Sequence, residues 1–194
     1  MSNKSLALIL VKYREKPLTL DVARSICDEM FPRVEKQSVE SLVLGDYVIA
    51  QERFLDVAHE LEPLHKAHYT EWADKDAGLY KPMYQKIAAI DSGGGIEQFT
   101  VRHHGCVVGH MRFFVQTNHK TGELIAIEDG LFIVLEHRVG MLGLKLWRFA
   151  ENVLRLRGVA DVEFASPPGS RSAALSKRMK YRVKAVVYTK RLAT

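Results

Sequence analysis

The 194-residue sequence has few cysteines and no long apolar run. Cys27 and Cys106 are too few and too far apart for a disulfide framework, so we expect a reducing, cytoplasmic compartment. No apolar stretch reaches the roughly 18 residues of a transmembrane helix, so no membrane partner is expected. The sequence also lacks a zinc spacing, and we predict no metal site, because its cysteines do not combine with its central histidines, His68, His103, His104, His110 and His119.

The sequence further lacks an internal repeat, a low-complexity linker, and a serine or cysteine in a strand–helix elbow, which argues against nucleophile-elbow hydrolases. Positive charge, by contrast, is concentrated at one end. Residues 137–194 hold 13 Lys and Arg against 3 Asp and Glu, whereas the first 46 residues hold 7 of each. A basic carboxyl third suits the phosphates of a cofactor, nucleic acid or an acidic partner, and a solvated charged face is the alternative.

The most informative stretch runs from Ile125 to Gly158. It predicts a buried strand over Leu131–Leu135, a glycine-bearing turn, and an amphipathic helix from about Leu142 to Arg157. The apolar face of that helix comprises Leu146, Trp147, Ala150, Val153 and Leu154. A helix start that follows such a turn presents free N–H groups to an anion, and Arg138 adds positive charge. The stretch therefore predicts a pyrophosphate-binding turn.

The remaining pattern predicts an appendage over residues 1–45 and one domain over 46–194. In the appendage, Ser5–Tyr13 fits a strand or a helix, and a helix from about Leu20 to Met30 follows. The appendage suits dimerisation or a lid, and a DNA-binding helix–turn–helix is the less favoured alternative. For the domain we predict helices at Leu55–Trp72 (kinked or broken at Pro63), Pro82–Ile90 and Ser172–Met179, a plain turn at Gly93–Gly95, and strands at Tyr47–Phe54, Phe99–His103, Cys106–Gln116, Glu123–Leu135, Asp161–Ser166 and Tyr181–Leu192.

The turn Arg138–Gly143 resembles the Arg/Gln-x-x-Gly-x-Gly/Ala motif of the Gcn5-related N-acetyltransferases. Arg138 and Gly143 match, Met141 stands where the family has its first glycine, and Gly140 is one place early. The resemblance extends over Tyr47–Leu192, with a glycine-bounded hairpin phrase at Gly105–Gly109 and an ending similar to the family's Tyr-x-Lys-x-Leu strand. Residues 65–72 are similar to a His-Trp-x-Glu phrase of a phage and prophage branch.

The resemblance implies an α+β fold, an α/β/α sandwich with a mixed, mostly antiparallel and splayed central sheet. It also implies acetyl-CoA as cofactor. Backbone groups of Phe132, Ile133 and Val134 would pair with the pantetheine arm. The pyrophosphate would lie on the turn and helix start formed by Arg138, Val139, Gly140, Met141, Leu142 and Gly143.

Glu128 and Asp129 precede the apolar half of the central strand and are the candidate general bases, with Asp129 favoured. The alternative is that the inward carboxylate caps a turn or pairs with an arginine. Ser176 stands where the family often has a tyrosine that reprotonates the thiolate, and a serine is a poorer proton donor. His68 and Glu71 share a helix face and could line an acceptor pocket, or could form a surface pair.

These features predict an acetyl-CoA-dependent N-acetyltransferase that acts on a primary amine of a small molecule or a protein. A catalytically weak binding or inhibitory protein with the same fold is a second hypothesis, and a nucleic-acid-directed acyltransferase is a third. A homodimer is compatible with the sequence, and nucleic acid is a less favoured partner.

Overall fold

The computed structural model describes residues 6–30, 39–72, 78–166 and 169–186. The chain divides into two compact units, Met1–Glu163 and Phe164–Thr194. At its amino end, α1 (Leu6–Tyr13) and α2 (Leu20–Met30) form a helical hairpin, so the helical alternative is the one observed over residues 6–13. The Tyr13 hydroxyl donates to Glu29 at 2.7 Å, which ties the two helices together.

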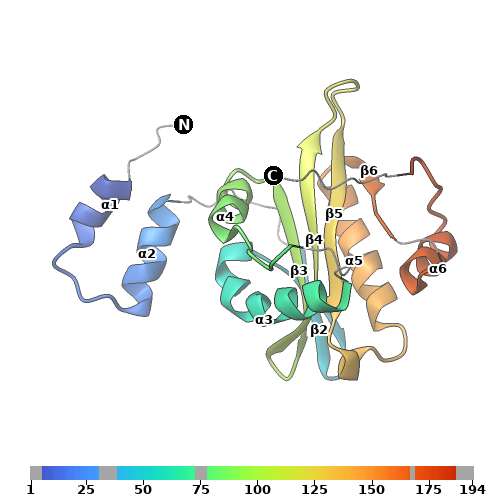
Figure 1. The fold of residues 1–194 in the computed structure, drawn as a ribbon, viewed down its shortest axis with the longest axis horizontal. Helices are drawn as coiled ribbons and strands as arrows, with labels where there is room; N and C mark the ends of the chain where they lie inside the picture. The colour runs from blue at the N-terminus through green and yellow to red at the C-terminus, as the bar shows by residue number, and fades with distance from the viewer. Residues whose placement is uncertain (1–5, 31–38, 73–77, 167–168, 187–194) are drawn as a thin grey trace. The chain divides into compact units, whose positions relative to one another are not determined.

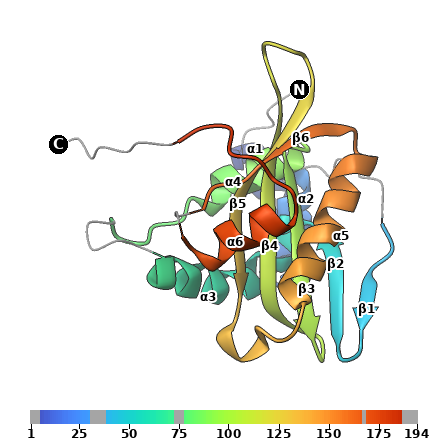
Figure 2. The ribbon, with the colours of Figure 1, turned by 90° about the vertical axis from the view of Figure 1, so that its right-hand side faces the viewer.

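A six-stranded sheet forms the centre of the first unit, in the order β1-β2-β3-β4-β5-β6 (Figures 1 and 2). Its strands are β1 (Leu42–Leu44), β2 (Tyr47–Glu52), β3 (Ile96–His103), β4 (Cys106–Thr117), β5 (Leu124–Ile133) and β6 (Val159–Glu163). Neighbours are antiparallel except β5 and β6, which are parallel. The sheet is therefore mixed and mostly antiparallel, as predicted.

Helices cover the two faces of this sheet (Figures 1 and 2). One face carries α3 (Phe54–Trp72) and α4 (Tyr84–Ser92), and the other carries α5 (Leu142–Leu156). The α/β/α arrangement of the acyl-CoA N-acyltransferase fold is thereby confirmed. Helix α3 runs unbroken through Pro63, so the predicted break does not occur, although a proline removes one helical hydrogen bond. Packing of the apolar face of α3 against the sheet stabilises the helix despite this loss.

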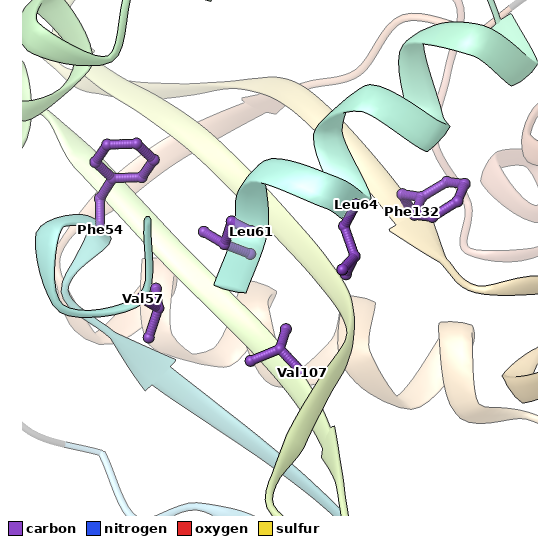
Figure 3. Packing of buried hydrophobic residues seen from close by; sticks show 6 residues of the cluster. All are labelled: Phe54, Val57, Leu61, Leu64, Val107 and Phe132. Carbon is purple, nitrogen blue, oxygen red and sulfur yellow. The ribbon is translucent and has the colours of Figure 1, made fainter. Parts of the chain in front are cut away.

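That packing is a cluster of buried side chains between α3 and the sheet (Figure 3). It comprises Phe54, Val57, Leu61 and Leu64 from α3, Val107 from β4 and Phe132 from β5. On the opposite face, all five apolar residues predicted for α5 are buried, with Trp147 and Leu146 at 0% exposure. Gly158 ends this helical segment with φ of +83°, a conformation that glycine adopts without strain.

Truncation of Leu61 should measure how firmly α3 is held. Because the Leu61 side chain is fully buried in the cluster, Leu61→Ala should lower the free energy of unfolding by about 2–5 kcal/mol. Urea denaturation followed by circular dichroism gives the value. Leu79→Ala is the matched control, since Leu79 is 97% exposed and its loss should cost nothing measurable. Equal losses in both variants would contradict this packing.

Two predicted strands differ from the structure near the carboxyl end. β6 is Val159–Glu163 rather than Asp161–Ser166, because it begins directly after Gly158 and pairs with the first part of β5. The predicted closing strand at Tyr181–Leu192 is wrong over residues 181–186, which have no strand structure, and its rest lies outside the described residues. Alternating apolar residues alone do not form a strand without a neighbour to pair with. Gly93–Gly95 is the predicted plain turn.

Candidate functional site

The sheet opens along one edge of β5. β6 pairs only with Leu124–Ile127, whereas β5 continues to Ile133, so Glu128–Ile133 has no neighbouring strand on that side among the described residues. On the other side, the pairing with β4 shifts register, because Arg112 faces Gly130 and Phe113 faces Glu128. Asp129 is therefore the extra residue of a β-bulge, which breaks the regular ladder beside the open edge.

Backbone hydrogen bonds decide which groups of β5 face this open edge. The Val134 N–H donates to the Val108 carbonyl at 2.9 Å and so points toward β4. Because successive residues direct their backbone groups to opposite edges of a strand, those of Ile133 point to the open edge. Of the three residues predicted to meet a pantetheine arm, Phe132, Ile133 and Val134, only Ile133 thus offers backbone groups there.

The chain then enters a turn and the start of α5. After the 3-10 turn η1 (Leu135–His137), Gly140 has φ of +53°, which suits glycine. The residue before α5, Met141, makes no capping bond with its side chain. N–H groups in the first turn of a helix have no acceptor within the helix, which leaves those of Gly143 and Leu144 for a ligand. A Cβ at Gly143 would meet only Ile133 Cδ1, at 3.8 Å, so the protein itself leaves space there.

Arg138 is already engaged in this state of the protein. Its Nε donates to the Ile133 carbonyl at 2.6 Å, and one of its amino groups donates to Glu71 Oε1 at 2.8 Å. The guanidinium also lies 5.2 Å from the centre of the Phe132 ring. Hydrogen bonding to Arg138 lowers the pKa of Glu71, so this carboxylate is charged at neutral pH. The Ile133 carbonyl at the open edge and Arg138, the predicted phosphate-binding cation, are thus hydrogen-bonded to each other. Glu71 of α3 binds the same arginine.

Release of Arg138 from Glu71 should strengthen binding of a phosphate-bearing ligand at the turn. An exposed ion pair is worth about 0.2–1 kcal/mol, so Glu71→Gln should tighten coenzyme A binding by up to about fivefold. Calorimetric titration gives the dissociation constant. Glu62→Gln is the control, because it removes an exposed carboxylate from the same helix. Weaker binding in Glu71→Gln would mean that Glu71 supports the ligand instead of competing with it.

The two candidate bases have different surroundings. Asp129 accepts two hydrogen bonds from Arg112, one of them from Nε at 2.8 Å, so this carboxylate is paired with an arginine. Glu128 is half-buried, and burial, followed by the charge of Asp129, raises the pKa of Glu128 to about 8. A carboxyl group with such a pKa holds a proton and can exchange it near neutral pH. The structure thus favours Glu128 over Asp129 as a proton acceptor.

A buried histidine cluster lies on the α3 side of the bulge. The His65 ring is 4.6 Å from that of His110, and the His68 ring is 6.1 Å from His110 and stacks on Phe132 at 5.3 Å. Atoms of His68 and His110 would lie 3.4 and 3.6 Å from a Cβ at Gly130. Burial lowers the pKa of His65 to about 3 and that of His110 well below its usual value, so both rings are neutral.

From the sequence, His68 was predicted to line a pocket, whereas His65, His110 and Arg112 were given no place in the site. His110 and Arg112 alternate with the buried Met111 and Phe113 along β4. Polar residues at every second position of an otherwise buried strand are the signal that could have found them. His68 and Glu71 lie on one face of α3 as predicted, but Glu71 contacts Arg138. Ser176 lies in α6 (Arg171–Arg178) of the second unit, where its hydroxyl donates to the Ser172 carbonyl at 2.9 Å.

Comparison with known proteins identifies which solved structures share this fold. No protein-family model matches the sequence, and no curated protein matches it. Solved structures do match. A ribosomal-protein-alanine N-acetyltransferase from Brucella melitensis biovar Abortus 2308 is 18% identical with a TM-score of 0.59, and the match covers 76% of this chain and 99% of that one. An aminoglycoside acetyltransferase from an uncultured soil metagenomic sample, in complex with trehalose, is 13% identical with a TM-score of 0.62, covering 76% and 97%.

An acetyltransferase from Trypanosoma brucei is similar to the same extent, at 18% identity and a TM-score of 0.58, covering 76% of this chain and all of that one. Among the described residues, no helix is long and apolar enough to cross a membrane. Identities this low establish the architecture and not the reaction. The chain has the fold of the Gcn5-related acetyltransferases, the acyl-CoA N-acyltransferase fold.

Proposed function

We propose that this protein is an acetyl-CoA-dependent N-acetyltransferase. One observation carries the proposal. The open edge of β5, from Glu128 to Ile133, leads directly into a turn that bears Arg138 and into a helix whose first amides lack a side-chain cap. An extended ligand with amide groups at one end and phosphates at the other fits this arrangement, because the strand edge can bind amides and the arginine and helix start can bind phosphates. Acetyl-CoA has that layout and would supply the acetyl group as a thioester.

In this proposal the residues of the turn and the strand hold the ligand. The amides of Gly143 and Leu144, together with Arg138, would bind the pyrophosphate, for which Arg138 must leave Glu71. Gly140 and Met141 shape the turn, and Val139 and Leu142 bracket it, with a hydrogen bond from the Leu142 N–H to the Val139 carbonyl at 3.2 Å. Ile133 would pair its backbone with the pantetheine amides once Arg138 releases its carbonyl.

The chemical work assigned to the protein is positioning and proton transfer. Glu128 would accept the proton of the attacking amine, directly or through water, and a positioned general base contributes about 10²–10⁴-fold to the rate. Burial, and after it the charge of Asp129, would keep the pKa of Glu128 high. Correct alignment of amine and thioester can contribute about 7–11 kcal/mol more. The role of Ser176 as proton donor to the leaving thiolate stays a prediction from the sequence.

The acceptor is proposed to be a primary amine that approaches from the α3 face. His68, His110 and Gly130 lie together on that side of the bulge, and Arg112 with Asp129 adds polar groups beside them. The similar proteins include enzymes named for a ribosomal-protein alanine and for aminoglycosides, so both a protein amino terminus and an aminoglycoside are sensible acceptors to try first.

The test is a turnover assay that follows thiol release from acetyl-CoA with a panel of amines containing amino-terminal peptides, lysine peptides and aminoglycosides. Stimulation of thiol release by one of these classes, with an acetylated product identified by mass spectrometry, would support the proposal. If coenzyme A fails to bind in a calorimetric titration at sub-millimolar concentration, the proposal is wrong.

A catalytically weak binding protein is the second candidate, and the engagement of Arg138 by Glu71 and the Ile133 carbonyl favours it. In that case coenzyme A would not bind at sub-millimolar concentration, and no amine would be acetylated. A cytoplasmic location, an origin in a phage or prophage branch, a homodimer and the division at residue 45 stay predictions.

A further inference from the structure

A second group of chemically active side chains lies at the opposite end of β2 from α3. The turns β1–β2 and β3–β4 are tight, since Leu44 pairs with Tyr47 across Gly45–Asp46, and His103 pairs with Cys106 across His104–Gly105. Because Tyr47 pairs with His103, the two turns lie side by side at one end of the sheet (Figure 2). The His104 N–H donates to the Asp46 carbonyl at 3.4 Å, which links them directly.

Three metal-ligating side chains converge there. Ligand atoms of Asp46, His103 and His104 all lie within 4.8 Å of one another. The His103 and His104 rings are 4.1 Å apart, and the His137 ring is 4.8 Å from that of His103. His104 and Asp46 are exposed and His103 is half-buried, so an ion could reach all three. The titratable groups that interact electrostatically with His103 are His104, His137 and the Asp46 carboxylate.

The backbone of His104 is a second, independent observation. Its φ is +47°, a left-handed conformation at the first position of a two-residue hairpin turn. Asparagine, aspartate and glycine are the preferred residues at such a position. A histidine here gives up turn stability, and its imidazole then stands beside His103 and Asp46. Strain of this kind is often found where a side chain has a binding role.

We propose that Asp46, His103 and His104 form a binding site for a divalent transition-metal ion of the zinc class. Two imidazole nitrogens and one carboxylate oxygen suit Zn²⁺, whose bonds to such ligands are about 2.0–2.2 Å long, better than Mg²⁺ or Ca²⁺, which prefer all-oxygen sites. Tetrahedral bonds of about 2.1 Å place ligand atoms about 3.4 Å apart, so small side-chain rotations from the observed spacing suffice. Three protein ligands leave a fourth position for water.

The linear sequence does not predict this site, because its ligands do not follow a zinc spacing. Asp46 and His103 are 57 positions apart and become neighbours through the pairing of β2 with β3. His137 lies against the site from η1, with its Nδ1 3.0 Å from the Tyr47 hydroxyl. An ion here would join two hairpin turns beside the segment that leads into the turn at Arg138. The proposal of this metal site does not depend on the proposal that coenzyme A binds.

The experiment is a calorimetric titration of ZnCl₂ into the full chain, freed of any affinity tag and stripped with EDTA, in a buffer that does not bind metals. We expect one equivalent bound with micromolar affinity, unchanged by excess Mg²⁺. Loss of a residue that only supports a metal ligand typically weakens metal binding by about 10–100-fold. His104→Gly removes a ligand itself, so it should weaken Zn²⁺ binding by more than this. Because glycine suits the left-handed turn, this variant should keep or exceed the melting temperature of the unmodified protein without metal.

His119→Ala is the control, since His119 is an exposed histidine in the β4–β5 turn, and it should bind Zn²⁺ as tightly as the unmodified protein. Zinc should also raise the melting temperature of the unmodified protein and of His119→Ala, but not that of His104→Gly. Absence of binding, or equal affinity in His104→Gly and the unmodified protein, would overturn the proposal. So would an equal loss of affinity in His119→Ala.

Discussion

Replacement of Arg138 by glutamate is expected to abolish coenzyme A binding. The guanidinium stands at the mouth of the turn that precedes α5, and a charge-assisted hydrogen bond to phosphate is worth about 1.5–3 kcal/mol. The substitution removes that bond and places a carboxylate beside a pyrophosphate and beside Glu71. Together these effects should weaken binding by more than about 100-fold, measured by calorimetric titration.

Arg148→Glu is the matched control for this experiment. Arg148 is an exposed arginine of α5, so its reversal changes the net charge equally without touching the turn. Binding in that variant should stay within about twofold of the unmodified protein at physiological salt. If Arg138→Glu binds coenzyme A as well as Arg148→Glu does, the ligand does not use this turn.

Glu128→Gln is the second substitution with a large expected effect. Removal of a general base should lower kcat/KM by about 10²–10⁴-fold and leave coenzyme A affinity within about twofold, because the side chain handles the proton and not the phosphates. Glu123→Gln is the control, since Glu123 is an exposed carboxylate just before β5. Retention of the unmodified rate in Glu128→Gln would assign the proton to another group.

The pH profile gives this prediction a distinctive form. Because the pKa of Glu128 is raised to about 8, the ionised base becomes scarcer by tenfold for each pH unit below that value. The ratio of kcat/KM between the unmodified protein and Glu128→Gln should therefore rise with pH and level off above about 8. Titration of the acceptor amine affects both proteins equally and cancels in the ratio. A ratio that is flat between pH 6 and pH 9 would exclude Glu128 as the base.

Raising the pH should increase the activity that depends on Glu128 but lower the stability of the folded protein. The carboxyl group of Glu128 favours its proton more in the folded state, with a pKa of about 8, than in the unfolded state, near the ordinary value of 4.5. The folded state is therefore penalised progressively as the pH rises from 4.5 to 8, and the penalty is constant above that. Glutamine carries no such penalty, so Glu128→Gln should melt at a higher temperature than the unmodified protein at pH 9 and at a similar one at pH 4.

Local patterns in the sequence predicted much of the fold. The apolar residues of α5, from Leu146 to Leu154, were predicted from helical spacing, and all of them are buried. The turn and helix around Arg138 were also predicted, since glycine and helix-start signals act over a few residues. The predicted buried strand over Leu131–Leu135 is wrong at its end, because β5 stops at Ile133 and Leu135 is exposed in η1. The closing strand over residues 181–186 was wrong, because strand formation depends on a distant pairing partner that composition does not reveal.

The candidate site residues were named from the sequence, but the contacts between their side chains could not be predicted from it. Glu128 and Asp129 were identified from their place before an apolar run, but the bulge that separates them depends on the register with Arg112 and Phe113. The Arg112–Asp129 and Arg138–Glu71 pairs join residues 17 and 67 positions apart, and such contacts exist only once the sheet and α3 have packed. These pairs favour Glu128 as the proposed base and make Glu71 a competitor for Arg138, the arginine proposed to bind pyrophosphate.

The most direct test is an amide NMR titration of the ¹⁵N-labelled protein with coenzyme A. We expect the largest shifts on the N–H groups of Val139–Leu144 and Ile133, with smaller changes along Glu128–Leu131. Adenosine 3′,5′-diphosphate, which lacks the pyrophosphate and the pantetheine arm, should leave the Ile133 N–H signal unchanged. Largest shifts at any other part of the sheet, or none at these amides at saturation, would contradict the proposed coenzyme A site.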